Sequence, residues 1–100
     1  MNTLVTENAV AESVAVSAEE LTVRLADGRS VSAPLVWYPR LLNGTATERK
    51  RWRLIGDGEG IHWPALDEDI SVVNILAGKP SGESQKSFKR WLTARAETAR

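Results

Sequence analysis

Residues 21–34 read LTVRLADGRSVSAP, and this stretch decides the fold class. Apolar and polar residues alternate on both sides of Asp27-Gly28, and such alternation is typical of half-buried strands. An Asp-Gly pair between two alternating runs is a strong hairpin signal, because these residues tolerate the positive φ angles of a tight turn. We therefore predict strands near residues 20–26 and 29–33, joined as a hairpin.

The alternation extends back toward the N-terminus. Val10, Val14 and Val16 recur at even spacing, which predicts a further strand near residues 11–17. The first eight residues are polar and rich in Thr, so we expect residues 1–8 to be disordered and the domain to begin at residue 9.

The segment after the hairpin predicts short helices. Pro39 prevents one regular helix over residues 34–42. Thr45 and Glu48 have the spacing of a capping box, which predicts a helix near residues 46–51. We expect Trp52 to point inward and the basic residues of this helix to face water, namely Arg49, Lys50 and Arg51.

The second half predicts two strands and two helices. Residues 53–55 and 61–63 suit strands on either side of a glycine-rich turn. Ser71 suits the N-cap of a helix over residues 72–77 that Gly78 ends. Residues 79–83 have the composition of a linker, and Ser84 can cap a last helix near residues 85–97. The domain itself is therefore expected to span residues 9–78, with a C-terminal helix in residues 84–100.

The chain has 100 residues, which suits one compact domain. Its apolar fraction of 42% and charged fraction of 26% are those of an ordinary soluble globular protein. Thirteen basic and thirteen acidic side chains cancel, so no overall charge favours nucleic acid or an anionic membrane. The absence of cysteine excludes disulfides and thiol chemistry. Because no secretory signal or membrane-spanning run is found, we expect a cytoplasmic protein.

Charge nevertheless alternates in blocks along the chain. Residues 1–33 and 54–80 are net acidic, whereas residues 34–53 and 81–100 are net basic. Such blocks indicate faces that complement each other within the fold or across an oligomer, so a homodimer is among the expected arrangements. A polyanion site is the alternative interpretation.

The lone histidine, His62, is the first candidate for chemistry. Three carboxylates follow it closely, so a histidine–carboxylate pair for proton transfer can be considered. No Ser, Thr or second His stands at a spacing diagnostic of a nucleophile system, and the carboxylates do not complete a recognised metal spacing. We therefore expect a structural histidine, and assign no catalytic residue, metal or cofactor.

The acidic residues Asp67, Glu68 and Asp69 are a second candidate site. They shortly precede the helix expected after Ser71, and carboxylates near a helix N-terminus are favoured by about 0.3–1 kcal/mol each. Three acids in a row also form an acidic knob. The knob can pair with a basic stretch of the same chain, such as residues 49–53, or dock on a partner.

The last helix is the third candidate, because its pattern is amphipathic. One side groups Phe88, Trp91, Leu92, Ala96 and Ala99. The opposite side groups Lys86, Lys89, Arg90 and Arg100, while Arg95 falls in the apolar sector. The helix can pack on its own domain, dock on a second copy or another protein, or bind nucleic acid. The nucleic-acid signature is weak, because base-reading neighbours are missing.

Several motifs together carry a family resemblance: Asp27-Gly28-Arg29, Trp37-Tyr38-Pro39-Arg40-Leu41, Thr45 to Arg49, Ile61-His62-Trp63-Pro64 and Leu66 to Ser71. With them, the stretch from Leu21 to Gly78 resembles the bacterial and phage family called domain of unknown function 2442. The resemblance implies a small α+β fold without established catalytic residues. Family members are often encoded beside a small partner, in pairs assigned as toxin–antitoxin systems. Some relatives add a helix-turn-helix, for which residues 84–100 are too short.

We expect an α+β fold with a small antiparallel sheet, short helices on one side and a C-terminal amphipathic helix. The expected function is a non-enzymatic protein-interaction module, the antitoxin-like or inhibitory subunit of a two-component system. Its partner would be a toxin-like or defence protein. The alternatives are a phage-encoded inhibitor of a host defence protein, and a small-ligand or metal-binding domain that uses His62 and the acidic knob. The expected partner-binding residues are Lys86, Phe88, Lys89, Arg90, Trp91, Leu92, Asp67, Glu68 and Asp69.

Overall fold

A computed structural model describes residues 9–98 of the chain. The disorder predicted for residues 1–8 and the places predicted for Ala99 and Arg100 lie outside the described residues. The first sheet is antiparallel and contains β1 (Ala11–Val16), β2 (Glu20–Leu25) and β3 (Ser30–Pro34) in that order. The predicted hairpin is confirmed: Gly28 has a φ of 96°, and the backbone N–H of Arg29 donates to the Asp27 carboxylate over 3.0 Å.

The second sheet is also antiparallel. It contains β4 (Arg53–Ile55), β5 (Gly60–Trp63) and β6 (Glu68–Ser71) in that order. The expected α+β class is confirmed, with the strands divided into two small sheets of three. Strand β6 is a finding that the sequence did not indicate, because its residues were expected only to lead into a helix.

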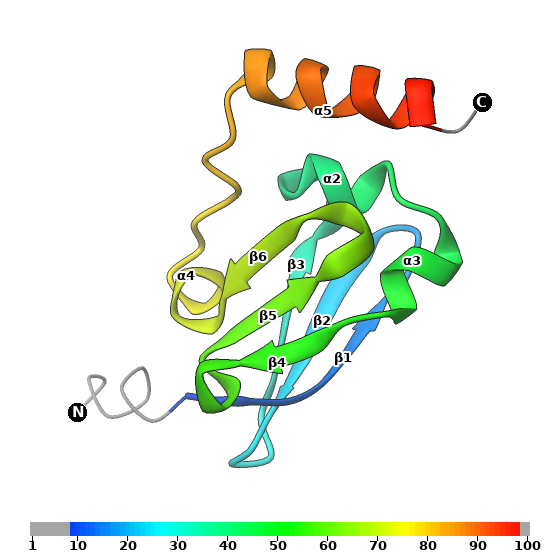
Figure 1. Cartoon of the computed structure of the whole chain (residues 1–100). Coiled ribbons are helices and arrows are strands. Elements are labelled where there is room, and N and C mark those ends of the chain that lie inside the picture. Colours follow the sequence, from blue (N-terminus) through cyan, green and yellow to red (C-terminus); the bar gives the residue numbers. More distant parts are fainter. Residues whose placement is uncertain (1–8, 99–100) are drawn as a thin grey trace.

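Short helices connect and cover the sheets, as Figure 1 shows. They are α2 (Pro39–Leu42), α3 (Ala46–Lys50), α4 (Val72–Leu76) and α5 (Gln85–Thr98). The predicted capping box is confirmed, since the N–H of Glu48 donates to the Thr45 hydroxyl over 3.1 Å and the N–H of Thr45 donates to the Glu48 carboxylate over 2.8 Å. Ser71 caps α4 as predicted. Within residues 9–98, no helix combines the length and apolar character needed to cross a membrane.

One surface prediction for α3 is wrong. Arg49 does not face water: its guanidinium donates to the carbonyl oxygens of Leu41 and Leu42 over 2.8 and 2.7 Å. These carbonyls belong to the last residues of α2, where helix carbonyls lack partners within the helix. Arg49 therefore joins α3 to α2, whereas Lys50 and Arg51 are exposed as expected.

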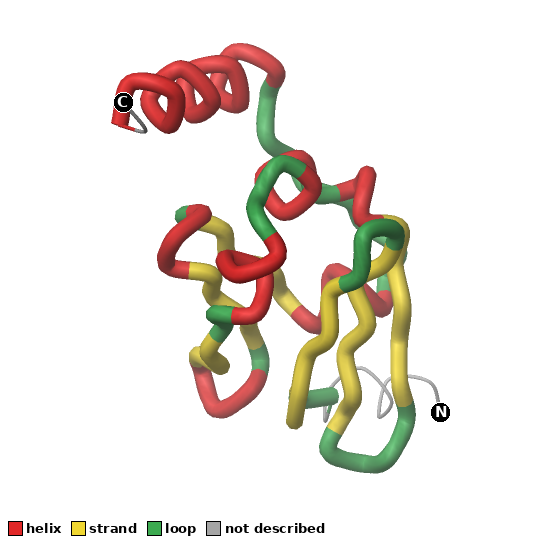
Figure 2. The backbone as a smooth tube through the Cα atoms, turned by 90° about the vertical axis from the view of Figure 1, so that its right-hand side faces the viewer, coloured by secondary structure: helices red, strands yellow, loops and turns green. Residues whose placement is uncertain are grey.

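The core lies between the two sheets, which Figure 2 shows from the side. Strand β2 supplies the alternate side chains of Leu21, Val23 and Leu25, and β5 supplies Ile61 and Trp63, all of them buried. Tyr38 and Leu41 are also buried in the core, while Trp37 and Trp52 are half-buried against it.

A close backbone approach joins the two sheets at one end. Gly58, in the turn before β5, has a φ of 94°, and a Cβ atom there would lie 2.9 Å from the carbonyl oxygen of Ala11. Only glycine accommodates both this positive φ and this contact. The turn between β4 and β5 can therefore lie directly against the start of β1.

Candidate functional site

Helix α5 lies at one end of the molecule, near α2, as Figures 1 and 2 show. It is connected to α4 by an irregular segment, residues 79–84. The segment is tied to the body where the N–H of Ser81 donates to the carbonyl of Trp37 over 3.0 Å. Ser84 caps the helix as predicted, accepting the N–H of Ser87 over 3.1 Å.

Trp91 is the α5 side chain that packs against the core. Two guanidinium groups lie over its ring system, with the central carbons of Arg40 and Arg95 5.4 and 4.8 Å from a ring centroid. Phe88 stacks on the same tryptophan, with 5.7 Å between centroids. Cation–π contacts of this kind contribute about 0.5–1 kcal/mol or more each when partly desolvated. The contact with Arg40 joins the helix to α2, whereas the contacts of Trp91 with Arg95 and Phe88 lie within α5.

Two ion pairs reinforce this attachment. Arg40 donates from Nε to both carboxylate oxygens of Glu83 over 2.9 and 3.0 Å, and this pairing lowers the pKa of Glu83. Arg95 donates to the two oxygens of Glu48 over 2.9 and 3.1 Å, which lowers the pKa of Glu48. These contacts explain why Arg95 stands in the apolar sector of the sequence pattern: it faces the body together with Trp91.

The opposite face of α5 carries unpaired cations. Lys86, Lys89 and Arg90 are exposed, and none of them forms an ion pair with the residues that the structure describes. Leu92 is 37% exposed beside them. The structure therefore divides the predicted partner-binding residues of α5: Trp91 packs against the body with Phe88 stacked on it, and the other four remain accessible.

The structure also places the three acidic residues before α4 in different surroundings. Asp67 takes a left-handed conformation with φ 52° after a 3-10 turn, and its backbone carbonyl accepts from Arg40 over 2.9 Å. The expectation that Glu68 and Asp69 merely precede a helix is wrong, because both belong to β6 and pair with β5. Asp69 stands directly opposite His62 and contacts its Nδ1. A histidine–carboxylate contact is therefore present.

Glu68 lines two adjoining hollows between β6 and the segment leading to α5. The larger, about 490 Å³, is shallow and includes Arg40 and Glu83. The smaller, about 130 Å³, includes Tyr38 and Lys79. Burial raises the pKa of Glu68 to about 7, with Glu83 and Asp69 raising it further and Arg40 opposing them. A carboxyl with this pKa changes charge near neutral pH.

Tyr38 and Arg40 are site residues that sequence reasoning missed. The sequence around them indicated only short helices. Nothing in the local sequence indicates that Tyr38 meets Glu68, thirty positions further along. No group of three or more His, Cys, Asp or Glu side chains suited to a metal ion is found among residues 9–98.

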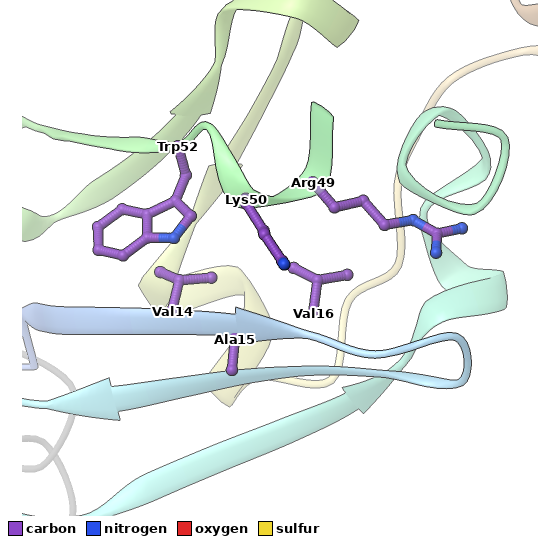
Figure 3. A pocket seen from close by; sticks show the side chains of 6 residues that line it. All are labelled: Val14, Ala15, Val16, Arg49, Lys50 and Trp52. Atoms are coloured by element: carbon purple, nitrogen blue, oxygen red, sulfur yellow. The ribbon is translucent and has the colours of Figure 1, made fainter. Parts of the chain in front are cut away.

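A third hollow, of about 280 Å³, lies at the outer edge of β1 and is drawn in Figure 3. Val14 and Val16 point toward Trp52 and Lys50, whereas the Arg49 side chain extends away toward α2. Its walls are mostly apolar, and within residues 9–98 Lys50 is the one lining cation without an ion pair and no group of polar side chains converges there. We assign it no chemistry.

The chain is similar to known proteins in sequence and in fold. The family described as "Protein of unknown function (DUF2442)" matches residues 11–81. A crystal structure of a protein of unknown function from Rhodospirillum rubrum is 23% identical, with a TM-score of 0.65, over 77% of this chain and 95% of that chain. An uncharacterized protein from Chromobacterium violaceum, solved by NMR, is 21% identical, with a TM-score of 0.66, over 85% and 78%. These likenesses show the fold. Among curated proteins, none matches the chain.

Proposed function

The chain belongs to the DUF2442 family, and on this premise we propose that it is a non-enzymatic protein-interaction module. We assign it the role of an antitoxin-like or inhibitory subunit that acts in the cytoplasm. The toxin–antitoxin gene pairs in which family members often stand support this role. The family match ends at Ser81, before α5 begins, which supports an additional task for this helix.

The observation that carries the proposal is the outward face of α5. It presents Lys86, Lys89 and Arg90 without ion pairs among the described residues, beside the exposed Leu92. Complementary charge steers association and selects partners, while an apolar side chain at the centre of such a patch adds affinity. The partner is therefore a protein with an acidic surface beside an apolar spot.

The experiment begins with a tagged full-length chain in its native host. The captured protein is identified, expressed separately and titrated against the pure chain by calorimetry. Reversing three charges, K86E/K89E/R90E, is expected to weaken binding by about tenfold or more, because each pairing is replaced by repulsion.

A matched control keeps the same change in net charge on another surface. K50E/R51E/R53E alters three exposed cations that likewise form no ion pair among the described residues. This variant should bind within about threefold of the parent if the α5 face makes the contact. Equal weakening by both variants, or by neither, would rule out the α5 face as the binding surface.

A further inference from the structure

The smaller hollow beside β6 contains a buried polar atom without a partner. Tyr38 is 2% exposed, and its hydroxyl forms no hydrogen bond with any of residues 9–98. Buried hydroxyls are nearly always hydrogen-bonded, so each exception calls for a physical explanation. Here the unpaired hydroxyl belongs to a residue that lines a hollow of about 130 Å³ together with the carboxyl of Glu68. The arrangement points to a bound group that donates hydrogen bonds.

We propose that this hollow binds a protonated primary amine, namely a lysine side chain of the protein partner, with the Tyr38 hydroxyl and the Glu68 carboxylate accepting its hydrogen bonds. The amine chemistry stands on the hollow itself. Only the statement that a protein carries the amine rests on the proposed function.

The charges around the hollow select a cation. Asp69 also lines it, and Asp67 and Glu83 stand in the adjoining larger hollow. Arg40 is already engaged by Glu83 and Asp67. Lys79 also lines the smaller hollow, but the four carboxylates outnumber these two cations, so an anionic ligand would meet net negative surroundings.

The acceptors favour an ammonium over other cations. Three N–H groups on one nitrogen can donate to a carboxylate, a hydroxyl and a third acceptor at once. The carboxamide of Asn74 lines the same hollow and forms no side-chain hydrogen bond among the described residues. A metal ion would need more ligands of the kind that it prefers, and residues 9–98 contain no such group.

Ionisation of Glu68 links this binding to pH. Its carboxyl has a pKa of about 7, with burial as the main cause. The charged groups that face it are Arg40 from α2, Glu83 from the segment before α5 and Asp69 from its own strand, and Lys79 lines the hollow as well. Because only the ionised carboxylate attracts an ammonium, affinity should rise by about tenfold between pH 6 and pH 8.

The test is a titration of the full-length, ¹⁵N-labelled protein with N-acetyl-lysine methylamide, followed by two-dimensional NMR. We expect saturable shifts of the backbone amides in residues 68–71 and 78–82. The neutral probe N-acetyl-norleucine methylamide has the same four-carbon side chain without the ammonium group and should cause none. Equal shifts with both probes, or no saturable shift at pH 8, would refute the amine site.

Two variants test whether Glu68 and Tyr38 accept hydrogen bonds from the amine. E68Q is expected to weaken binding by about tenfold and to abolish its pH dependence, and Y38F by about threefold to tenfold. Y38F removes a hydroxyl that has no partner, so it should fold as well as the parent, and its NMR spectrum checks this. Unchanged affinity in a folded E68Q protein would overturn the assignment.

One further measurement distinguishes a failure of the amine site from a failure of the proposed function. K86E/K89E/R90E should bind the lysine probe within about twofold of the parent, since none of these residues lines the hollow. A failed partner assay would then leave the amine site standing. A titration with butylammonium identifies the source of the amine. Binding weaker than that of the lysine probe supports an amine carried by a peptide. Tighter binding supports the site but assigns it to a small free amine.

Discussion

Trp63 is the largest fully buried side chain among the described residues. It lies on β5 between the two sheets, and its indole N–H donates to the carbonyl of Arg49 over 3.1 Å. We predict that Trp63→Ala lowers the free energy of unfolding by about 3–5 kcal/mol, because it leaves a large cavity and an unpaired carbonyl. Urea unfolding followed by circular dichroism measures the loss. Trp63→Phe is the control, with about half that cost. A Trp63→Ala variant as stable as the parent would mean that this residue is not a core residue.

Glu68 should make the stability of the folded chain fall as the pH rises, which is an unusual direction for a carboxyl group. Its pKa is about 7 in the folded chain, against about 4.5 when exposed. The folded state therefore binds a proton more tightly than the unfolded state, and stability falls as the pH rises from about 4.5 to about 7. We predict that the free energy of unfolding of Glu68→Gln rises relative to that of the parent by about 1–2 kcal/mol between pH 5 and pH 8. This value is reduced for the partial exposure of the carboxyl.

The measurement is thermal melting of both proteins at several pH values. Other groups titrate over the same range, so only the difference between parent and variant is compared. A difference that stays constant from pH 5 to pH 8 would mean that Glu68 is ionised with an ordinary pKa, and the pH dependence expected of the amine site would also fail.

The turn between β4 and β5 should be more sensitive than the turn of the β2–β3 hairpin. Gly58 and Gly28 have nearly the same positive φ, 94° and 96°, but a Cβ at Gly58 meets the backbone of Ala11, whereas at Gly28 nothing lies within 4 Å. We predict that Gly28→Ala costs about 1 kcal/mol from strain alone, and Gly58→Ala about 2–4 kcal/mol. Chemical denaturation compares the two variants. Equal costs would show that the contact between turn and strand relaxes freely.

Some structural elements are indicated by local sequence signals, and others are not. The hairpin, the capping box of Thr45 and Glu48, and the cap at Ser71 follow from short-range chemistry, so the sequence predicted them. Strand β6 escaped prediction, because Glu68 and Asp69 are residues that strands disfavour and the turn at Asp67 breaks the alternation. Arg49 reaches back to α2, and sequence spacing does not reveal such a partner. The contacts of α5 escaped for the same reason, since Arg40 and Glu48 lie more than forty positions away.

In the whole molecule, the ion pairs around α5 join the two net basic blocks of the sequence, and among the described residues only Arg40–Asp67 joins a basic block to an acidic one. Arg40 and Glu48 of the basic block pair with Glu83 and Arg95 around α5. These contacts attach the last helix by polar and cation–π interactions more than by apolar burial. The helix depends on the body for these contacts, whereas the buried core cluster contains no residue of α5.

Truncation after Gly78 tests this independence. We predict that residues 1–78 still unfold in one cooperative transition, because the buried core lies between the two sheets. Loss of the Trp91 contacts and of Glu83 should cost about 1–2 kcal/mol, which lowers the melting temperature by roughly 5–15 °C in a domain of this size. Differential scanning calorimetry measures the transition, and full-length Trp91→Ala provides a control that removes the main anchor but keeps the chain. A truncated chain that melts without a cooperative transition would show that α5 completes the core, and its assignment as a separate interaction element would then be wrong.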